Sequence, residues 1–179
     1  MGKQQLKNQN ESKQNTSSLI QSMNTSNPYK DILLNQINQV VTESPSAFMI
    51  WLRPVVKEIG EGRLIFEFTV SPIMINPGGT LHGGVISAMM DDMVGATILC
   101  LGKANLYATI SNVIDYMAPA KLDEVVTGKT EIIKLGQQII NVQFELWNMN
   151  KKRLLARGYS NNLKTEFLVP ELSPSAKIK

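Results

Sequence analysis

The stretch that decides the fold is NPGGTLHGGVISAMMDDM, which runs from Asn76 to Met93. Its polar, glycine-rich first half holds His82, the only histidine of the chain. Its apolar second half has the spacing of a helix and carries Asp91. A carboxylate among apolar residues is costly to bury, so it usually has a structural partner or a chemical role. We therefore expect a long central helix over residues 83–101, with a functional group on it.

Successive residues of a helix are rotated by about 100°, and this rotation sorts the segment into faces. One face, which we assign to a sheet, gathers Ile86, Met89, Met90, Met93 and Thr97. A second face gathers small residues around one carboxylate, namely Ser87, Ala88, Asp91 and Gly95. Asp91 is therefore the candidate functional carboxylate, the alternative being a polar residue on a solvated face. We expect Asp92 to point elsewhere and to contact solvent or form a salt bridge.

The rest of the chain supplies one more helix and several strands. The helix is predicted over residues 28–42, between Asn27-Pro28, which is typical of a helix start, and Ser44-Pro45, which ends it. Strands are predicted over residues 48–56, 63–70, 106–116, 124–135, 138–148 and 153–163. This order indicates an α+β fold, in which the apolar helix must lie against the inner face of the one available sheet.

A single domain is expected from a chain of 179 residues. Residues 1–27 are rich in Gln, Asn, Ser and Lys and contain few large apolar side chains, so we predict a disordered tail. Residues 28–169 form the folded domain, including its N-terminal helix. Residues 170–179 are predicted to be a loose C-terminal tail.

Composition excludes several classes of function. The chain has one cysteine, Cys100, and one histidine, so we expect neither an internal disulfide nor a transition-metal site. A net charge of +3 is too weak to indicate nucleic-acid binding. We find no apolar run long enough to span a bilayer and no signal sequence, so we expect a cytoplasmic protein without membrane insertion.

The start of the central helix is a candidate site for a developing negative charge. Its first N–H groups lack partners within the helix and lie at the positive end of the helix dipole. Gly83 and Gly84 leave these groups open to an oxyanion, although a glycine pair can also serve only close packing. The side-chain amide of Asn76 can donate to the same oxygen or can instead close an Asx-turn. His82 can act as a general base, but we favour a role in holding the loop.

Within one chain, Asp91 lies too far from the start of the helix to act together with Gly83. Asp91 follows His82 by nine positions, which is roughly 13 Å along a helix. Reacting atoms must come within about 3–3.5 Å of one another. A second copy of the helix, antiparallel across a two-fold axis, would bring Asp91 of one chain to Gly83 of the other. If these residues form one site, the protein is at least a dimer.

Two motifs taken together resemble a known family. They are Asn76-x5-His82-Gly-Gly84-x6-Asp91 and the segment Ile114-Asp-Tyr-Met-Ala-Pro-Ala120. Together they are similar to the hotdog-fold acyl-CoA thioesterases, closest to the phenylacetate-pathway and thioesterase-superfamily branch. The likeness covers residues 48–163. It implies an antiparallel sheet wrapped around a long central helix, with homodimers that often pair into homotetramers.

The resemblance also implies a hydrolytic site at the dimer interface and a role for each residue. Asn76 and the N–H of Gly83 would bind the thioester carbonyl, while Asp91 of the other subunit would be nucleophile or general base. Thr109 stands where the family has a serine that helps to orient water, and His82 would support the loop. The implied reaction converts an acyl-CoA into free acid and CoA; CoA belongs to the substrate, and no separate cofactor is implied.

Two alternatives to hydrolysis stay open at this point. A non-catalytic acyl-CoA-binding module could use the same groove without cleaving its ligand. A hotdog dehydratase or hydratase is less favoured, because the chain lacks an Asp-x4-His pair of the hydratase type.

Overall fold

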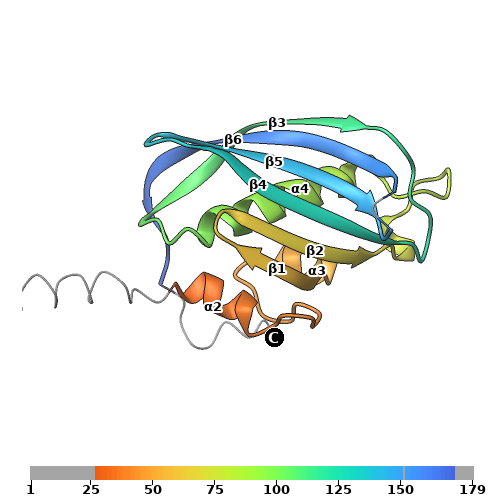
Figure 1. Ribbon diagram of the computed structural model, residues 1–179, viewed down its shortest axis with the longest axis horizontal. Coiled ribbons are helices and arrows are strands. Elements are labelled where there is room, and N and C mark those ends of the chain that lie inside the picture. Colours follow the sequence, from red (N-terminus) through yellow and green to blue (C-terminus); the bar gives the residue numbers. More distant parts are fainter. Residues whose placement is uncertain (1–26, 151, 172–179) are drawn as a thin grey trace, which may run out of the picture.

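The computed structural model describes residues 27–150 and 152–171 of the chain. A six-stranded antiparallel sheet, in the order β1-β2-β4-β5-β6-β3, arches over the long helix α4, Gly83–Leu99 (Figure 1). The predicted α+β arrangement of one sheet around one central helix is confirmed. Most of the two predicted tails lies outside the described residues, since these omit residues 1–26 and 172–179.

The strands agree with four of the predicted ranges and extend one of them. Their bounds are β1 Val55–Gly60, β2 Arg63–Thr69, β3 Asn105–Tyr116, β4 Val125–Leu135, β5 Ile139–Asn148 and β6 Leu154–Leu168. Strand β6 continues past its predicted end because β3 pairs with it as far as Asn105 opposite Leu168. This order leaves β1 and β3 as the two sheet edges. In the part of the chain that the structure describes, no helix is long and apolar enough to cross a membrane.

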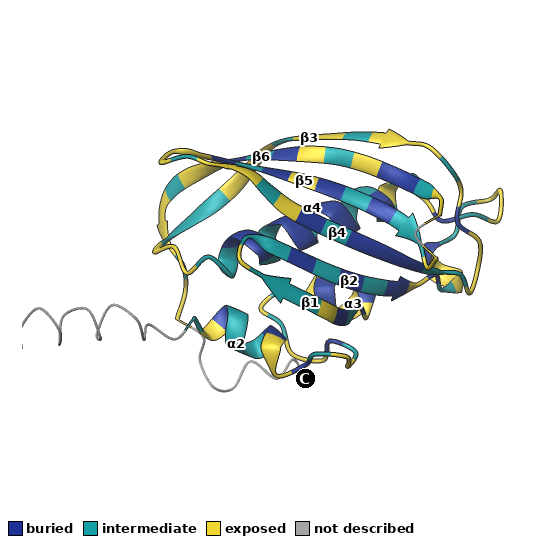
Figure 2. Cartoon of the chain, in the orientation of Figure 1, coloured by how far each residue is buried: buried dark blue, intermediate teal, exposed yellow. Residues whose placement is uncertain are grey.

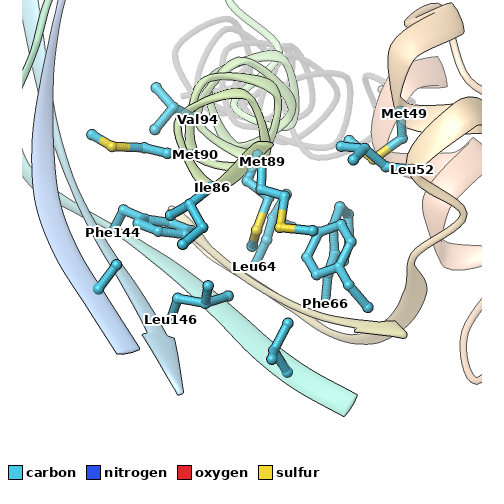
Figure 3. Packing of buried hydrophobic residues seen from close by; sticks show 14 of the residues in the cluster. Met49, Leu52, Leu64, Phe66, Ile86, Met89, Met90, Val94, Phe144 and Leu146 are labelled. Atoms are coloured by element: carbon cyan, nitrogen blue, oxygen red, sulfur yellow. The ribbon is translucent and has the colours of Figure 1, made fainter. Parts of the chain in front are cut away.

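The core forms between one face of α4 and the inner face of the sheet. The predicted inward residues are all buried: Ile86, Met89, Met90, Met93 and Thr97. Figure 3 shows Ile86 and Met89 lying between Phe144 of β5 and Phe66 of β2. Each fully buried side chain of this kind contributes about 1.5–3 kcal/mol relative to an exposed one. This burial fixes which side of α4 faces away from the sheet.

The predicted helix over residues 28–42 is wrong beyond its first two turns. Helix α2 spans Pro28–Leu34, with the predicted cap at Asn27, whose Oδ1 accepts hydrogen bonds from Tyr29 and Lys30. The chain then turns at Asn38, where φ is 60°. Beyond the helix, Ile37 and Val40 form bridges to β1 instead of continuing a helical stripe. Tertiary pairing with the sheet edge therefore overrides the local apolar spacing.

The predicted strand over residues 48–56 is also wrong in its first part. Helix α3 covers Ala47–Leu52, and β1 begins only at Val55. Ser46 starts α3 by accepting a hydrogen bond from the N–H of Met49, and Arg53 ends it at φ 51°. Met49 and Leu52, three positions apart, are both buried. That spacing matches one face of a helix and outweighs the strand propensity of the segment.

Asp92 does not behave as expected, because it is half-buried and forms no salt bridge with any residue that the structure describes. Its Oδ1 accepts a hydrogen bond of 2.5 Å from Ser46 Oγ, which joins α4 to the start of α3. Its Oδ2 is buried and has no partner among the described residues. Burial raises the pKa of Asp92; the Ser46 hydrogen bond partly offsets the rise, and the Asp91 charge adds to it. Asp92 is thus a structural link that is costly to ionise.

The edge strand β3 approaches its neighbour closely at one glycine. A Cβ atom on Gly158 of β6 would lie 2.2 Å from the backbone oxygen of Val113 and 3.2 Å from the sulfur of Met90. A backbone atom cannot move aside as a side-chain end can. On the outer side of α4, a Cβ on Gly95 would meet no atom of residues 27–150 or 152–171 within 4 Å. The two glycines therefore have opposite packing environments.

We predict that Gly158→Ala lowers the free energy of unfolding by about 1–3 kcal/mol, because β3 must shift away from β6. Gly95→Ala is the matched control: it adds the same methyl group in open space and should be neutral or stabilise the helix by up to about 1 kcal/mol. Urea denaturation followed by circular dichroism measures both changes. Equal stabilities for the two variants would contradict the packing described for β3.

A second prediction concerns Asp92→Asn, which keeps an acceptor for Ser46 and removes the ionisation. Because the pKa of Asp92 is raised on folding, the folded protein binds this proton more tightly than the unfolded chain does. Stability from this group is lost as the pH rises from the ordinary pKa of 3.8 through the raised folded value. The variant should therefore melt above the wild type at pH 8, with a gap that closes towards pH 4. A gap that does not change with pH would refute this account.

Candidate active site

The loop before α4 is held by the side chain of Asn76. Its Oδ1 accepts hydrogen bonds from the N–H of Gly78 at 2.9 Å and of Thr80 at 3.2 Å. Its amide nitrogen donates to Thr80 Oγ1 at 3.0 Å. Asn76 thus forms the Asx-turn that the sequence offered as an alternative, and this turn orients the amide. An amide nitrogen carries two hydrogens, so one donor remains for a ligand.

His82 caps α4 and uses one nitrogen to do so. Its Nδ1 accepts a hydrogen bond of 2.8 Å from the N–H of Gly84. An imidazole nitrogen that accepts carries no hydrogen, so the neutral ring has its proton on Nε2. Its backbone oxygen accepts from Val85 and Ile86. The side chain occupies the loop-holding position that the sequence favoured over that of a general base.

These bonds leave one N–H group of the first helical turn open. The N–H groups of Gly84, Val85 and Ile86 each donate a hydrogen bond to His82. None of the described residues accepts a hydrogen bond from the N–H of Gly83. The group lies at the positive end of the α4 dipole. Together, Asn76, His82 and Gly83 form what we name the amide cluster, which can offer a backbone donor and a side-chain donor to an oxygen.

Tyr116 covers this turn, although the sequence indicated no role for it. Its hydroxyl lies 2.7 Å from Ser87 Oγ and 3.3 Å from the backbone oxygen of Gly83, to which it donates. A Cβ on Gly83 would meet the Tyr116 ring at 3.4 Å. The motif Ile114–Ala120 supplied the only sequence signal for this residue. Its position at the end of β3 makes it part of the wall beside the amide cluster.

Asp91 lies about two turns further along α4 and is held from β3. Its Oδ1 accepts hydrogen bonds of 2.9 Å from Thr109 Oγ1 and 2.9 Å from Asn112 Nδ2. Its Oδ2 has no hydrogen-bond partner among the described residues, and the side chain is exposed in the isolated chain. We name Asp91, Thr109 and Asn112 the acid cluster. Two donors on one oxygen fix the carboxylate and leave the other oxygen for a reactant.

The sequence pattern did not identify Asn112 as a site residue, because strand β3 contains a bulge. Residues three apart in a regular strand face opposite sides of the sheet. The pairing of β3 with β6 shifts register between Thr109 and Ser111. A bulge adds one residue and reverses the alternation that follows, so Thr109 and Asn112 reach the same carboxylate. No local sequence pattern marks this bulge.

The structure does not bring the two clusters together within one chain. Gly83 and Asp91 lie eight positions apart on a single straight helix, which is about 12 Å. A reaction needs its groups within about 3–3.5 Å. Each chain therefore presents two separate half-sites, one at the start of α4 and one at its middle.

A cavity of about 340 Å³ opens beside the acid cluster. Its wall includes Asp91, Thr109, Gly95 and Cys100, together with residues of α2 and of the segment before α3. Burial raises the pKa of Cys100 to about 11, so its thiol stays protonated at neutral pH. The described residues contain no cluster of His, Cys, Asp or Glu side chains that could hold a metal ion.

Comparison with known proteins agrees with this architecture. The family model described as Thioesterase superfamily matches residues 78–154. Acyl-coenzyme A thioesterase 13 from Homo sapiens is 25% identical to the chain over 125 residues, which is 70% of this chain and 89% of that protein.

Two solved structures show the same fold. The PaaI protein of the E. coli phenylacetic acid degradation operon superposes with a TM-score of 0.64 at 17% identity, over 70% of this chain and 89% of that one. A hypothetical thioesterase from Streptococcus pneumoniae TIGR4, solved with coenzyme A, superposes with a TM-score of 0.58 at 23% identity, over 62% of this chain and 84% of that one. Residues 78–154 therefore match the thioesterase superfamily, and the chain has the fold of these two structures, which is the hotdog fold that its motifs resemble.

Proposed function

We propose that this protein hydrolyses acyl-CoA thioesters to the free acid and CoA, at a site shared by two copies of the chain. The observation that carries the proposal is the acid cluster, in which Thr109 and Asn112 hold one oxygen of Asp91 and leave the other open. The thioesterase family match, a relative named acyl-coenzyme A thioesterase 13 and a structural neighbour that holds coenzyme A support the substrate class.

In the proposed reaction the amide cluster binds the thioester carbonyl oxygen. The N–H of Gly83 and the amide of Asn76 donate to this oxygen and stabilise the negative charge that develops on it. Asp91 of the partner subunit attacks the carbonyl carbon directly or removes a proton from an attacking water. The CoA thiolate leaves readily, so the site needs no strong acid. His82 positions the turn and takes no part in the proton transfer.

Assembly of the shared site uses the outer face of α4 and the free edge strand. Strand β3 is exposed or half-exposed over its whole length (Figure 2). Ile110 and Val113, on this strand, are 53% and 44% exposed. An unpaired strand edge with apolar side chains is a surface that favours pairing with another chain. Pairing two β3 strands about a two-fold axis would set the α4 helices antiparallel, as the mechanism requires. The proposed assembly is a homodimer, or a homotetramer formed from two such dimers.

We predict that Asp91→Asn lowers the turnover number by a factor of about 10²–10⁴ without changing the oligomeric state, because an amide can neither attack nor remove a proton. Release of free thiol from acetyl-, decanoyl- and phenylacetyl-CoA measures turnover. Glu131→Gln is the matched control, since it neutralises an exposed carboxylate of β4 that pairs with Lys129. Near-normal turnover by Asp91→Asn would refute the assignment. A wild type that binds these esters and releases no thiol would instead be a binding module.

A mixing experiment tests whether the site is shared. Asn76→Asp keeps the acceptor for Gly78 and Thr80 but removes the amide donor, and should lower turnover by about 10²–10³. Mixed dimers of Asn76→Asp and Asp91→Asn, purified through two different affinity tags, should regain about half of the wild-type activity, because one of their two sites is intact. If each site lay within one chain, the mixed dimers would remain as inactive as either parent.

A further inference from the structure

The cavity beside the acid cluster follows one face of α4. Three of its lining residues, Asp91, Gly95 and Leu99, are separated by single helical turns. From the first to the last the distance along the helix is about 12 Å. A group whose carbonyl carbon is held at Asp91 can therefore extend along the helix into the cavity. The mechanism described above makes no use of this space.

Gly95 leaves space in the wall of the cavity, one helical turn after Asp91. It lies in the interior of α4, where glycine is less favourable than alanine by about 1 kcal/mol. A Cβ at this position would meet no atom of the described part of the chain within 4 Å. Packing among the described residues therefore does not require a glycine here. A large side chain at position 95 would instead project into the space next to Asp91.

The outer wall of the cavity comes from the segment of residues 27–53. Tyr29, Ile32 and Leu33 of α2 line it, as does Met49 of α3. The wall is anchored at two points: Asn27 Nδ2 donates to the backbone oxygen of Leu99 at 3.0 Å, and Tyr29 Oη donates to that of Pro170 at 2.7 Å. This segment precedes residues 78–154, which match the thioesterase family.

The lining is polar at the end near Asp91. Thr109 donates to Asp91 and also lies within hydrogen-bond distance of Asn162, while Ser46 donates to the neighbouring Asp92. Further from Asp91 the cavity meets Leu33, Leu99 and the protonated thiol of Cys100. A buried thiol behaves as a small apolar group. The gradient suits a ligand with a polar head and an aliphatic tail.

We propose, on the basis of the hydrolytic function inferred above, that this cavity binds the acyl chain and that Gly95 and Ile32 limit its length. A water molecule occupies about 30 Å³ in the liquid, and a methylene group is of similar size. A volume of about 340 Å³ therefore holds on the order of ten chain carbons. The preferred substrates are aliphatic acyl-CoA esters of medium length.

The test compares a series of acyl-CoA esters from acetyl to hexadecanoyl. In the wild type, kcat/KM should rise by up to about fourfold per added methylene until the cavity is full, near ten carbons, and then level off or fall. Gly95→Leu should lower the ratio of kcat/KM for decanoyl-CoA to kcat/KM for acetyl-CoA at least about 100-fold, because the longer chain needs the blocked space.

A second variant tests the wall from the other side. Ile32→Ala should move the optimum to longer chains by about two carbons. Leu34→Ala is its matched control, since Leu34 lies on the same helix, is 43% exposed and does not line the cavity; its length profile should match the wild type. Unchanged length profiles in both Gly95→Leu and Ile32→Ala would overturn the inference. A uniform loss for all esters, together with a loss of the dimer, would show that Gly95 serves subunit contact instead and would likewise overturn its assigned role.

A binding measurement distinguishes failure of this inference from failure of the proposed reaction. Titration calorimetry of Asp91→Asn with the same esters measures affinity without turnover, and its dependence on length should shift when Gly95→Leu or Ile32→Ala is added. If the wild type hydrolyses no ester, the proposed function fails. The dependence of affinity on chain length, measured by calorimetry, still shows whether the cavity binds the acyl chain. If hydrolysis is rapid and neither profile responds to the two substitutions, only the cavity assignment fails.

Discussion

Burial of one methionine-rich face of α4 beneath the sheet is the constraint on which the rest of the structure depends. Met89, Met90 and Met93 are fully buried, so the helix cannot rotate about its axis. The next residues around the helix must then face away from the sheet interior. Asp91 therefore stands at the surface, beside the edge strand whose Thr109 and Asn112 bind it. The hydrophobic packing of the core thus determines the direction of the one carboxylate assigned to chemistry.

Sequence patterns predicted the parts of the fold in which a single element buries one regular face. The 3.6-residue spacing of α4 and the alternation in β2 are of this kind. Residues 35–56 were predicted poorly because bridges to β1 and the cap at Ser46 decide their structure, and both depend on distant contacts. In the candidate site, the loop and Asp91 were predicted from their motif. Asn112 was not, because a bulge in β3 reverses its direction.

The length of α4 connects the fold to the proposed assembly. A helix holds its residues at fixed separations, so no movement of one chain closes the distance between the amide cluster and Asp91. The same rigidity would give two chains, paired antiparallel, two equivalent sites with identical geometry. The segment of residues 27–53 lies outside the domain matched to the family and covers the far side of the helix. Acyl selection would then be shared between Gly95 of α4 and this preceding segment.

The bulge in β3 also has a consequence for solubility. A long free strand edge invites the addition of further strands from any chain, which is how ordered aggregates begin. Between Thr109 and Ser111 the spacing of the backbone donors and acceptors on β3 is interrupted. A regular strand cannot form an unbroken ladder of hydrogen bonds along an edge that contains this bulge. A second β3 strand related by symmetry contains the same bulge. Bulges are one of the features by which proteins limit unwanted pairing at a strand edge, and the bulge that turns Asn112 towards the carboxylate is such a feature on β3.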